Sequence, residues 1–252
     1  MQFGTPRFQN YQPPPREISP EDGLLLIDKP FGPSSHDVVG DIRRKFGFKK
    51  VGHGGTLDPY ATGLLLILIG RGTSLSNQVM GCDKRYEGEI LVGTETNTQD
   101  LEGEVVSELP YDLVTVERMR EEAGKLTGDI YQVPPMASAI KKDGVPLYKL
   151  ARKGETVERD PRLVHVYKFS ITGYEAPVGR FDIVCGKGTY IRTLCHDLGQ
   201  ALGCGACMKS LRRTQCGAFS IDDALPLAEA LALPKSRLLE RVIPLHKVKD
   251  RI

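Results

Sequence analysis

The sequence of 252 residues predicts a mixed α/β domain organised around one buried strand. Six consecutive apolar residues, 64–69, lie between Gly63 and Gly70, a pattern typical of a strand buried on both faces. Strand-like and helix-like segments follow one another along most of the chain. A chain of this length can bury a substantial core, as one large domain or as a domain with an insertion.

The formal net charge of +2 says little about partners, but the charges are unevenly distributed. Residues 95–129 hold ten acidic and three basic side chains, whereas residues 140–215 hold fourteen basic and seven acidic ones. This division favours a polyanion lying along one side of the protein, with an ordinary solvated surface as the alternative. No segment approaches the roughly 18 apolar residues that cross a bilayer.

Six cysteines without secretory features are typical of a reduced cytosolic protein. Cys204 and Cys207 have the spacing of a metal or redox pair, but a structural zinc site needs a second ligand pair. The sequence offers no second pair of that kind, so the spacing is interpreted as accidental and no metal is expected.

The N-terminal segments are predicted from their local patterns. Residues 1–21 contain three consecutive prolines and no apolar run, which predicts a disordered tail. Residues 23–30 predict a short buried strand that ends in a turn. A helix follows, with Ser34 or Ser35 as its N-cap and Gly47 at its end. Opposite its apolar face, Arg43 and Arg44 begin a group of five bases in eight residues that could contact phosphates.

A glycine-rich loop precedes the buried strand and carries one acidic side chain, Asp58. Glycines allow positive φ and a close approach of another molecule, and Pro59 disfavours helix at the acid. Functional side chains are often mounted in this way, on loops held by a rigid element. The alternative is that Asp58 and Pro59 merely cap a turn.

Several later segments predict the rest of the scaffold. Strand-like patterns occur at residues 84–93, 103–106, 163–172 and 180–185, and residues 103–106 are expected to return beside 84–93. Helices are expected from Thr115 to about Gly128, from Thr189, which is a plausible N-cap, and from about Asp222. Residues 242–245 are expected to end the fold.

Tyr190 and Arg192 lie in the first turn of the helix predicted from Thr189, away from its apolar stripe. Helix N-termini favour anions, and an opposite charge nearby favours an ionised carboxylate. Arg192 could therefore hold Asp58 in its charged form, with a purely structural salt bridge as the alternative.

Residues 131–160 predict an insertion because prolines interrupt regular structure and basic residues follow. The segment contains one short helical pattern around Tyr148. Its basic side chains suit a mobile grip on an RNA backbone; they are Lys141, Lys142, Arg152 and Lys153. A long solvated loop is the alternative.

The stretch Gly52-His53-Gly54-Gly55-Thr56-Leu57-Asp58-Pro59, with Ala61-Thr62-Gly63 after it, resembles the hallmark motif of the TruB family of tRNA pseudouridine synthases. The segment from Lys29 to Ser35 and the Leu-Arg-Arg run at 211–213 are also similar to that family, and the likeness covers about residues 22–245. Tyr60 departs from the leucine or phenylalanine that is commoner there.

The resemblance implies a pseudouridine synthase fold, with a central mixed and mostly antiparallel sheet, flanking helices and a thumb insertion at 131–160. The catalytic domain would span residues 22–245, and 246–252 would form a C-terminal tail without the family's RNA-binding (PUA) module.

The implied activity converts the T-loop uridine of tRNA, position 55, to pseudouridine by base flipping, cleavage of the glycosidic bond and reattachment through C5. Asp58 would act at the ribose, by attack on C1′ or by a glycal route, beside Arg192. Tyr190 would contact the target base and Tyr86 would stack on it. The resemblance further implies that Leu211 packs on the other side of the base and that His53 takes the place of the flipped base.

The resemblance implies no cofactor and no metal, and a partner that is the T arm of tRNA. It also implies a cytoplasmic monomer that uses no guide RNA and no membrane. Two alternatives remain: a non-catalytic tRNA-binding or RNA-folding protein, and a glycoside-cleaving enzyme that releases free uracil.

Overall fold

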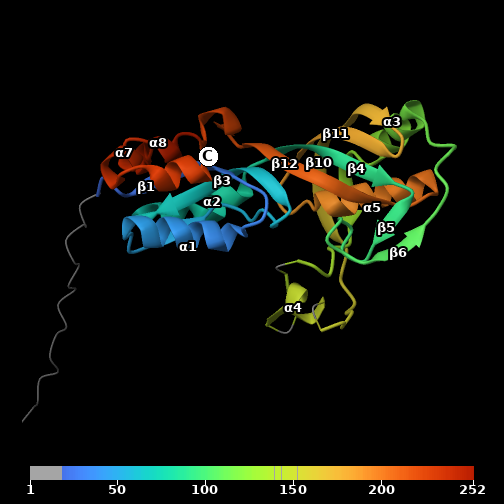
Figure 1. Ribbon diagram of the computed structural model, residues 1–252, viewed down its shortest axis with the longest axis horizontal. Coiled ribbons are helices and arrows are strands. Elements are labelled where there is room, and N and C mark those ends of the chain that lie inside the picture. Colours follow the sequence, from blue (N-terminus) through green and yellow to red (C-terminus); the bar gives the residue numbers. More distant parts are fainter. Residues whose placement is uncertain (1–18, 139, 143, 152) are drawn as a thin grey trace, which may run out of the picture.

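The computed structural model describes residues 19–138, 140–142, 144–151 and 153–252, with the side chain of Lys141 also outside the description. It contains one large sheet through the length of the molecule and helices on both faces (Figure 1). The predicted disordered tail at 1–21 falls almost entirely outside the described residues. Within the described residues, no helix has the length and apolar character needed to span a membrane.

The strands of the large sheet are Gly23–Lys29 (β1), Val51–His53 (β2), Ala61–Ile69 (β3), Lys84–Val92 (β4), Gly128–Gln132 (β7), Arg162–Glu175 (β10), Val178–Cys185 (β11), Ala206–Cys216 (β12), Phe219–Ser220 (β13), Leu225–Pro226 (β14) and Ile243–Pro244 (β15). Their main order is β14-β1-β3-β12-β4-β11-β10-β7. Neighbours are antiparallel except for the parallel pairs β1–β14 and β3–β12. The predicted mixed, mostly antiparallel sheet with flanking helices is therefore confirmed.

The helices are Ser35–Phe46 (α1), Ser76–Gly81 (α2), Val116–Lys125 (α3), Leu147–Ala151 (α4), Ile191–Leu202 (α5), Leu227–Ala232 (α6), Lys235–Leu239 (α7) and Leu245–Lys249 (α8), with short 3₁₀ turns at Gly70–Leu75 and Ile221–Asp223. Helix α1 begins as predicted: Ser34 and Asp37 form a capping box, and Gly47 ends the helix at a φ of 67°. Helix α5 differs from the prediction, because its N-cap is Tyr190 and not Thr189.

The core lies on both faces of β1 and β3 but on only one face of the other half of the sheet. Residues 64–69 of β3 are completely or almost completely buried, as the apolar run predicts. Helices α1 and α6 pack on one face of this half, and α2 and α8 on the other. Helices α3 and α5 cover one face of β4, β10 and β11. The opposite face of those strands carries polar side chains.

Two boundaries differ from the predictions. Residues 103–106 do not return beside 84–93; instead Val105–Glu108 (β6) pairs with Thr94–Thr96 (β5) in a separate hairpin. The chain beyond residue 245 is not wholly a tail, because α8 buries Val248 against β1.

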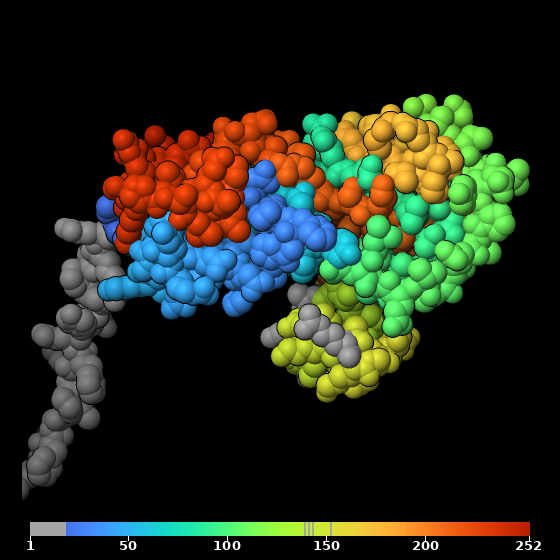
Figure 2. Space-filling model, in the orientation of Figure 1, coloured from blue at the N-terminus to red at the C-terminus, as the bar shows by residue number. Residues whose placement is uncertain are grey.

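The segment between β7 and β10 projects from the body as a separate lobe (Figures 1 and 2). It contains a short hairpin of Lys141–Lys142 (β8) and Val145–Pro146 (β9), followed by α4. Its position between two paired strands means that both ends of the lobe are fixed by the sheet. The lobe and helix α1 lie on the same lower side of the sheet in Figure 1.

Candidate active site

Asp58 lies on the loop between β2 and β3, in the middle of the molecule. The two strands are antiparallel, and the Gly54 N–H continues their pairing by donating to the Leu66 carbonyl at 2.8 Å. Gly55 and Gly63 have φ values of +122° and +99°, conformations that a side chain would strain. The glycines flanking the acid are therefore required by the path of the backbone.

Three buried side chains hold this loop by its backbone atoms. The Ser35 hydroxyl accepts from the Leu57 N–H and donates to the Leu57 carbonyl, both at 2.8 Å. The Lys29 ammonium donates to the carbonyl of Pro59 at 3.3 Å, immediately after Asp58. The Arg213 guanidinium donates to the carbonyls of Gly55, Thr56 and Leu64 at 3.2, 3.5 and 2.7 Å. These bonds fix the loop without using the Asp58 side chain.

Lys29 is fully buried, with 0% exposure, and also donates to the carbonyls of Pro30 and Pro33 at 2.8 Å. Burial lowers the pKa of its ammonium to about 8, against the opposing effect of the Asp58 charge. A buried ammonium is tolerated only when its donors are satisfied, and here backbone carbonyls satisfy all three. Lys29 therefore joins the turn after β1 to the Asp58 loop.

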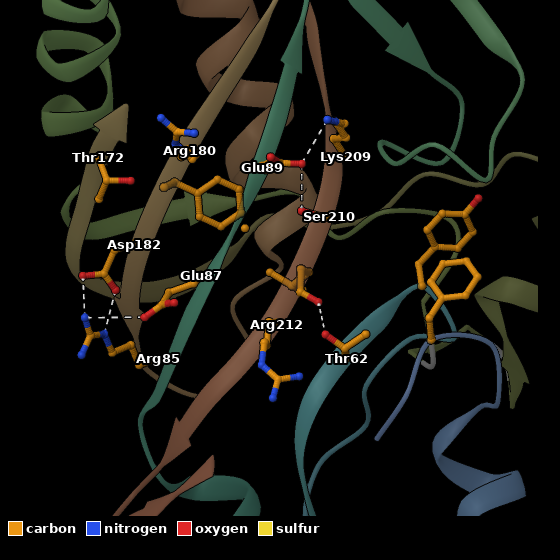
Figure 3. Close-up of a pocket in the computed structure, with 15 residues that line it drawn as sticks. Thr62, Arg85, Glu87, Glu89, Thr172, Arg180, Asp182, Lys209, Ser210 and Arg212 are labelled. Atoms are coloured by element: carbon orange, nitrogen blue, oxygen red, sulfur yellow. Dashed lines mark hydrogen bonds and ion pairs between the residues drawn. The ribbon is translucent and has the colours of Figure 1, made fainter. Parts of the chain in front are cut away.

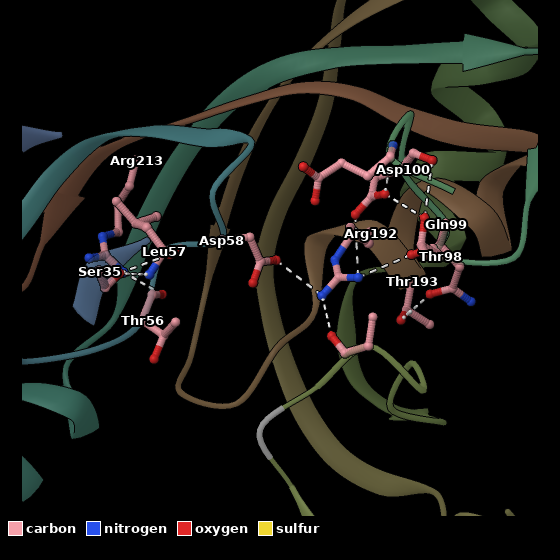
Figure 4. Close-up of polar contacts among 12 residues, drawn as sticks. Ser35, Thr56, Leu57, Asp58, Thr98, Gln99, Asp100, Arg192, Thr193 and Arg213 are labelled. Carbon is pink, nitrogen blue, oxygen red and sulfur yellow. Dashed lines mark hydrogen bonds and ion pairs between the residues drawn. The ribbon is translucent and has the colours of Figure 1, made fainter. Parts of the chain in front are cut away.

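Arg192 connects the Asp58 loop to the other half of the protein (Figure 4). Its guanidinium lies 3.0 Å from one Asp58 oxygen and 3.4 Å from an Asp100 oxygen. It also donates to the carbonyls of Thr98 and Ala137, at 3.1 and 2.7 Å. The prediction that Arg192 pairs with Asp58 is confirmed by this geometry. The side chain is nevertheless buried, with 6% exposure, because its polar partners surround it.

The two carboxylates on Arg192 differ in exposure. The Asp100 side chain is 5% exposed and also accepts from the Thr98 hydroxyl, whereas the Asp58 side chain is 40% exposed. Asp100 therefore neutralises and positions the guanidinium, and Asp58 remains accessible to another molecule. If both carboxylates were buried, the ion pairs of Arg192 would serve stability alone. Because Asp58 is exposed, this pair can also serve a function.

Tyr190 immediately precedes α5 and is held by the base of the 131–160 insertion. The Tyr190 N–H donates to the Gln132 side-chain oxygen at 2.8 Å, and the Gln132 amide donates back to the Tyr190 carbonyl at 3.0 Å. Burial raises the pKa of the Tyr190 phenol, while Ser138 and the Arg192 charge partly counter that effect. The phenol is therefore protonated at neutral pH and can donate a proton or a hydrogen bond.

Tyr86 and Leu211 lie on the adjacent strands β4 and β12 and belong to the core that also contains Leu57. Each is 9% exposed. Burial raises the pKa of Tyr86 to about 12, with Arg213 as the main opposing influence. Arg213 lies opposite Tyr86 in the sheet and donates to the Gly55 carbonyl, so it connects the strands of Tyr86 and Leu211 to the Asp58 loop. These side chains form an apolar surface that reaches the loop.

His53 ends β2 and is half-buried. Its pKa is lowered by burial and by the charges of Arg213 and His36, so the ring is neutral at physiological pH. Its Nδ1 atom is buried and has no hydrogen-bond partner among the described residues. His53 lies directly before the loop that carries Asp58.

The basic residues expected to contact RNA fall into two groups. Arg43 and Arg44 are exposed near the end of α1, where Arg44 pairs with Asp41 at 3.3 Å. In the projecting lobe, Lys141 lies in β8, and the Lys142 ammonium donates to the Glu158 carbonyl at 2.8 Å. Exposed Lys153 follows α4, and Arg152 lies outside the described residues.

Sequence reasoning missed the residues that position the site: Lys29, Ser35, Asp100, Gln132 and Arg213. Lys29 is the one of these residues with a local signal, because it is a charged residue at the end of the apolar strand β1, where a buried charge needs hydrogen-bond partners. The others act on segments far away in the chain.

The described part of the chain contains no group of three side chains arranged to hold a metal ion. Cys204 and Cys207 are both buried free thiols. What the site offers is an accessible carboxylate on a rigid loop, a guanidinium beside it, a protonated phenol and an apolar surface. Such a set can act on a sugar carbon while holding a flat base.

Comparison with protein families gives two adjoining matches. Residues 43–191 match the model for the TruB family pseudouridylate synthase (N terminal domain). Residues 192–248 match the tRNA pseudouridylate synthase B C-terminal domain.

Among curated proteins, tRNA pseudouridine synthase B of Opitutus terrae is 50% identical over 92% of this chain and 96% of its own length. The protein of the same name from Bordetella avium is 45% identical over 89% of this chain and 93% of its own length. Among solved structures, a chain of a Cbf5-Nop10-Gar1 complex has a TM-score of 0.70 and 27% identity. That match covers 92% of this chain and 63% of the other one.

Proposed function

This chain belongs to the TruB family of pseudouridylate synthases, and we propose that it isomerises the T-loop uridine of tRNA, position 55, to pseudouridine. The observation that carries this proposal is the Asp58–Arg192 pair at 3.0 Å, with an accessible carboxylate on a backbone-tethered loop. Family membership alone supplies a reaction class, and this pair supplies a residue able to perform it.

The reaction begins when the target nucleotide leaves the folded T loop, at a cost on the order of a few kcal/mol. The bond between uracil N1 and ribose C1′ breaks, the base turns, and a bond forms between C5 and C1′. The proton on C5 is lost and N1 gains a proton, so the mass is unchanged. No electron donor or group donor enters this balance, and we propose that no cofactor takes part.

Asp58 acts at C1′, either by direct attack or by assisting loss of a ribose proton on a glycal route. Arg192 holds one oxygen of its carboxylate at 3.0 Å and leaves the side chain 40% exposed. Tyr86 stacks on the detached uracil, and Leu211 packs against its other side, so that the base stays in place while it turns. Tyr190 contacts the base and moves a proton, for which its protonated phenol is suited.

His53 occupies the space that the flipped base leaves. Its low pKa suits this role, since a neutral ring stacks in the loop without a buried charge. His53 ends β2 directly before the loop that carries Asp58, so the two residues lie close together in the chain.

Binding to the T arm uses the basic residues of α1 and of the projecting lobe. Arg43 and Arg44 contact phosphates, and the basic residues of the insertion grip the backbone; they are Lys141, Lys142, Arg152 and Lys153. We propose that the protein works as a monomer without a guide RNA, in the cytoplasm where tRNA is found. Affinity should then fall steeply as salt rises.

The test is turnover on a tRNA transcript labelled with tritium at uracil C5. We expect tritium release that stops when uridine 55 is replaced by cytidine, together with a product of unchanged mass. Release of free uracil would identify a glycoside-cleaving enzyme instead. Tight binding of the transcript with neither tritium release nor free uracil would identify a non-catalytic RNA-binding protein.

A further inference from the structure

A groove of about 670 Å³ lies on the polar face of the sheet, opposite the core that contains Tyr86. Successive residues of a strand point to opposite faces, so Arg85 and Arg212 face the groove while Tyr86 faces the core. Leu211 belongs to the core and also lines the groove. Its volume falls within the range typical of small-ligand sites. Figure 3 shows its floor, formed by side chains of β4, β11 and β12.

One wall of the groove is an aromatic pair. The rings of Phe31 and Tyr60 meet edge to face with centroids 5.0 Å apart, and Phe31 is 61% exposed. A large apolar ring with most of its surface in water indicates a contact surface more than a core position. Aromatic side chains of this kind stack on nucleobases of any identity.

The aromatic wall is fixed relative to Asp58. The Gly32 N–H, next to Phe31, donates to the Pro59 carbonyl at 3.0 Å, between Asp58 and Tyr60. Tyr60 follows Asp58 by two residues, so their Cα atoms are within about 8 Å of each other. A base on this wall would therefore belong to a nucleotide close to the one that Asp58 reaches.

The floor of the groove is charged but electrically balanced. Its four cations are each paired with a carboxylate: Arg85 with Asp182 at 2.8 Å, Arg180 with Glu175 at 3.1 Å, Lys209 with Glu89 at 3.1 Å and Arg212 with Asp28 at 2.7 Å. Because the charges cancel locally, the floor does not favour a run of phosphates. It offers hydrogen-bond donors and acceptors side by side, which suit the edge of a neutral base.

We propose that this groove binds an unpaired nucleobase of the RNA substrate, from a nucleotide near the target, stacked on Phe31 and Tyr60. The proposal rests on the proposed function for the identity of the RNA. It adds a second base-binding site, on the face of the sheet opposite Tyr86, which shares only Leu211 with the residues proposed to hold the target base.

The absence of tryptophan from the sequence allows a direct test. In an Asp58→Asn background, Phe31→Trp places a single fluorescent indole on the wall, and a T-arm hairpin RNA serves as the probe. We expect saturable quenching at the RNA concentrations that give a complex in filter binding. Tyr167→Trp is the matched control, since Tyr167 is 55% exposed on β10 and does not line the groove.

A second measurement uses the affinity for the same RNA. Phe31→Ala with Tyr60→Ala should weaken binding by about five- to hundredfold, the range for loss of a stacked base, and Tyr167→Ala should leave it unchanged. Abasic substitution of the loop nucleotides beside the target should abolish the quenching of the Phe31→Trp reporter.

Full RNA binding without quenching of this reporter would overturn the proposal, as would quenching by free nucleoside monophosphates but not by the hairpin. Quenching that survives the abasic substitutions would also overturn it. The result is independent of catalysis: quenching with no tritium release from the wild-type protein would reject the proposed reaction and retain the groove.

Discussion

Replacing Asp58 with asparagine separates catalysis from structure in this site. The carboxylate is 40% exposed, and exposed ion pairs contribute about 0–1 kcal/mol to stability. Arg192 retains its other partners, Asp100 and two backbone carbonyls, so no buried charge is left alone. For a protein of this size, we expect the melting temperature to change by no more than about 4 °C.

The effect on the reaction should be much larger. A neutral amide can neither attack C1′ nor balance positive charge there, so tritium release should fall by at least about 10⁴-fold. That factor corresponds to roughly 5.5 kcal/mol of transition-state stabilisation, well above the stability change. Binding of the T-arm RNA, measured by filter retention, should persist.

Asp41→Asn is the matched control, because Asp41 is 39% exposed and its carboxylate also pairs with an arginine, Arg44, at 3.3 Å. This variant should turn over at close to the wild-type rate. Turnover by Asp58→Asn within tenfold of wild type, with a normal melting temperature, would refute the role given to Asp58.

Three further predictions concern the surrounding structure. Ser35→Ala removes both hydrogen bonds to the Leu57 backbone, so it should lower the free energy of unfolding by about 1–3 kcal/mol and lower kcat. The control Ser34→Ala should lower the free energy of unfolding by about 1 kcal/mol and leave kcat unchanged. Denaturation and turnover measure the two quantities, and equal kcat values for the two variants would contradict this prediction. The pKa of Lys29 is about 8 in the folded chain and lower than in the unfolded chain, which therefore binds the proton more tightly. Between pH 8 and 10.5 the free energy of unfolding of the wild type should rise by up to about 3 kcal/mol relative to that of Lys29→Met. Urea titrations in which the two proteins give parallel pH profiles would refute this prediction. Arg43→Gln with Arg44→Gln should weaken RNA binding uniformly and reduce the log–log salt slope by about 1.5, and an unchanged slope would place RNA elsewhere.

Much of the scaffold could be predicted because its signals are local. The apolar run of β3 and the capping box of α1 depend on neighbouring residues alone. The Asp58–Arg192 pair could be anticipated because a helix start favours an anion, even though 134 positions separate the two residues in the sequence. Thr189 was an incorrect choice of cap, since its hydroxyl instead donates to the Gly186 carbonyl.

Strand β12 was not predicted as a strand, although it lies in the centre of the sheet. Its pairing with β4 shifts register between Met208 and Ser210 and again between Arg213 and Gln215. Each shift breaks the alternation that reveals a strand in sequence. Burial of Arg213 was equally hidden, since its acceptors are carbonyls of residues about 150 positions earlier.

The acceptors that Lys29, Ser35 and Arg213 use on the Asp58 loop are main-chain atoms. Main-chain atoms are the same in every amino acid, so the shape of the loop does not depend on which side chains it displays. Evolution can therefore vary an outward position such as Tyr60 without moving the acid. Drift in the three anchoring side chains is more constrained, because losing any one of them removes a contact that holds the loop in place.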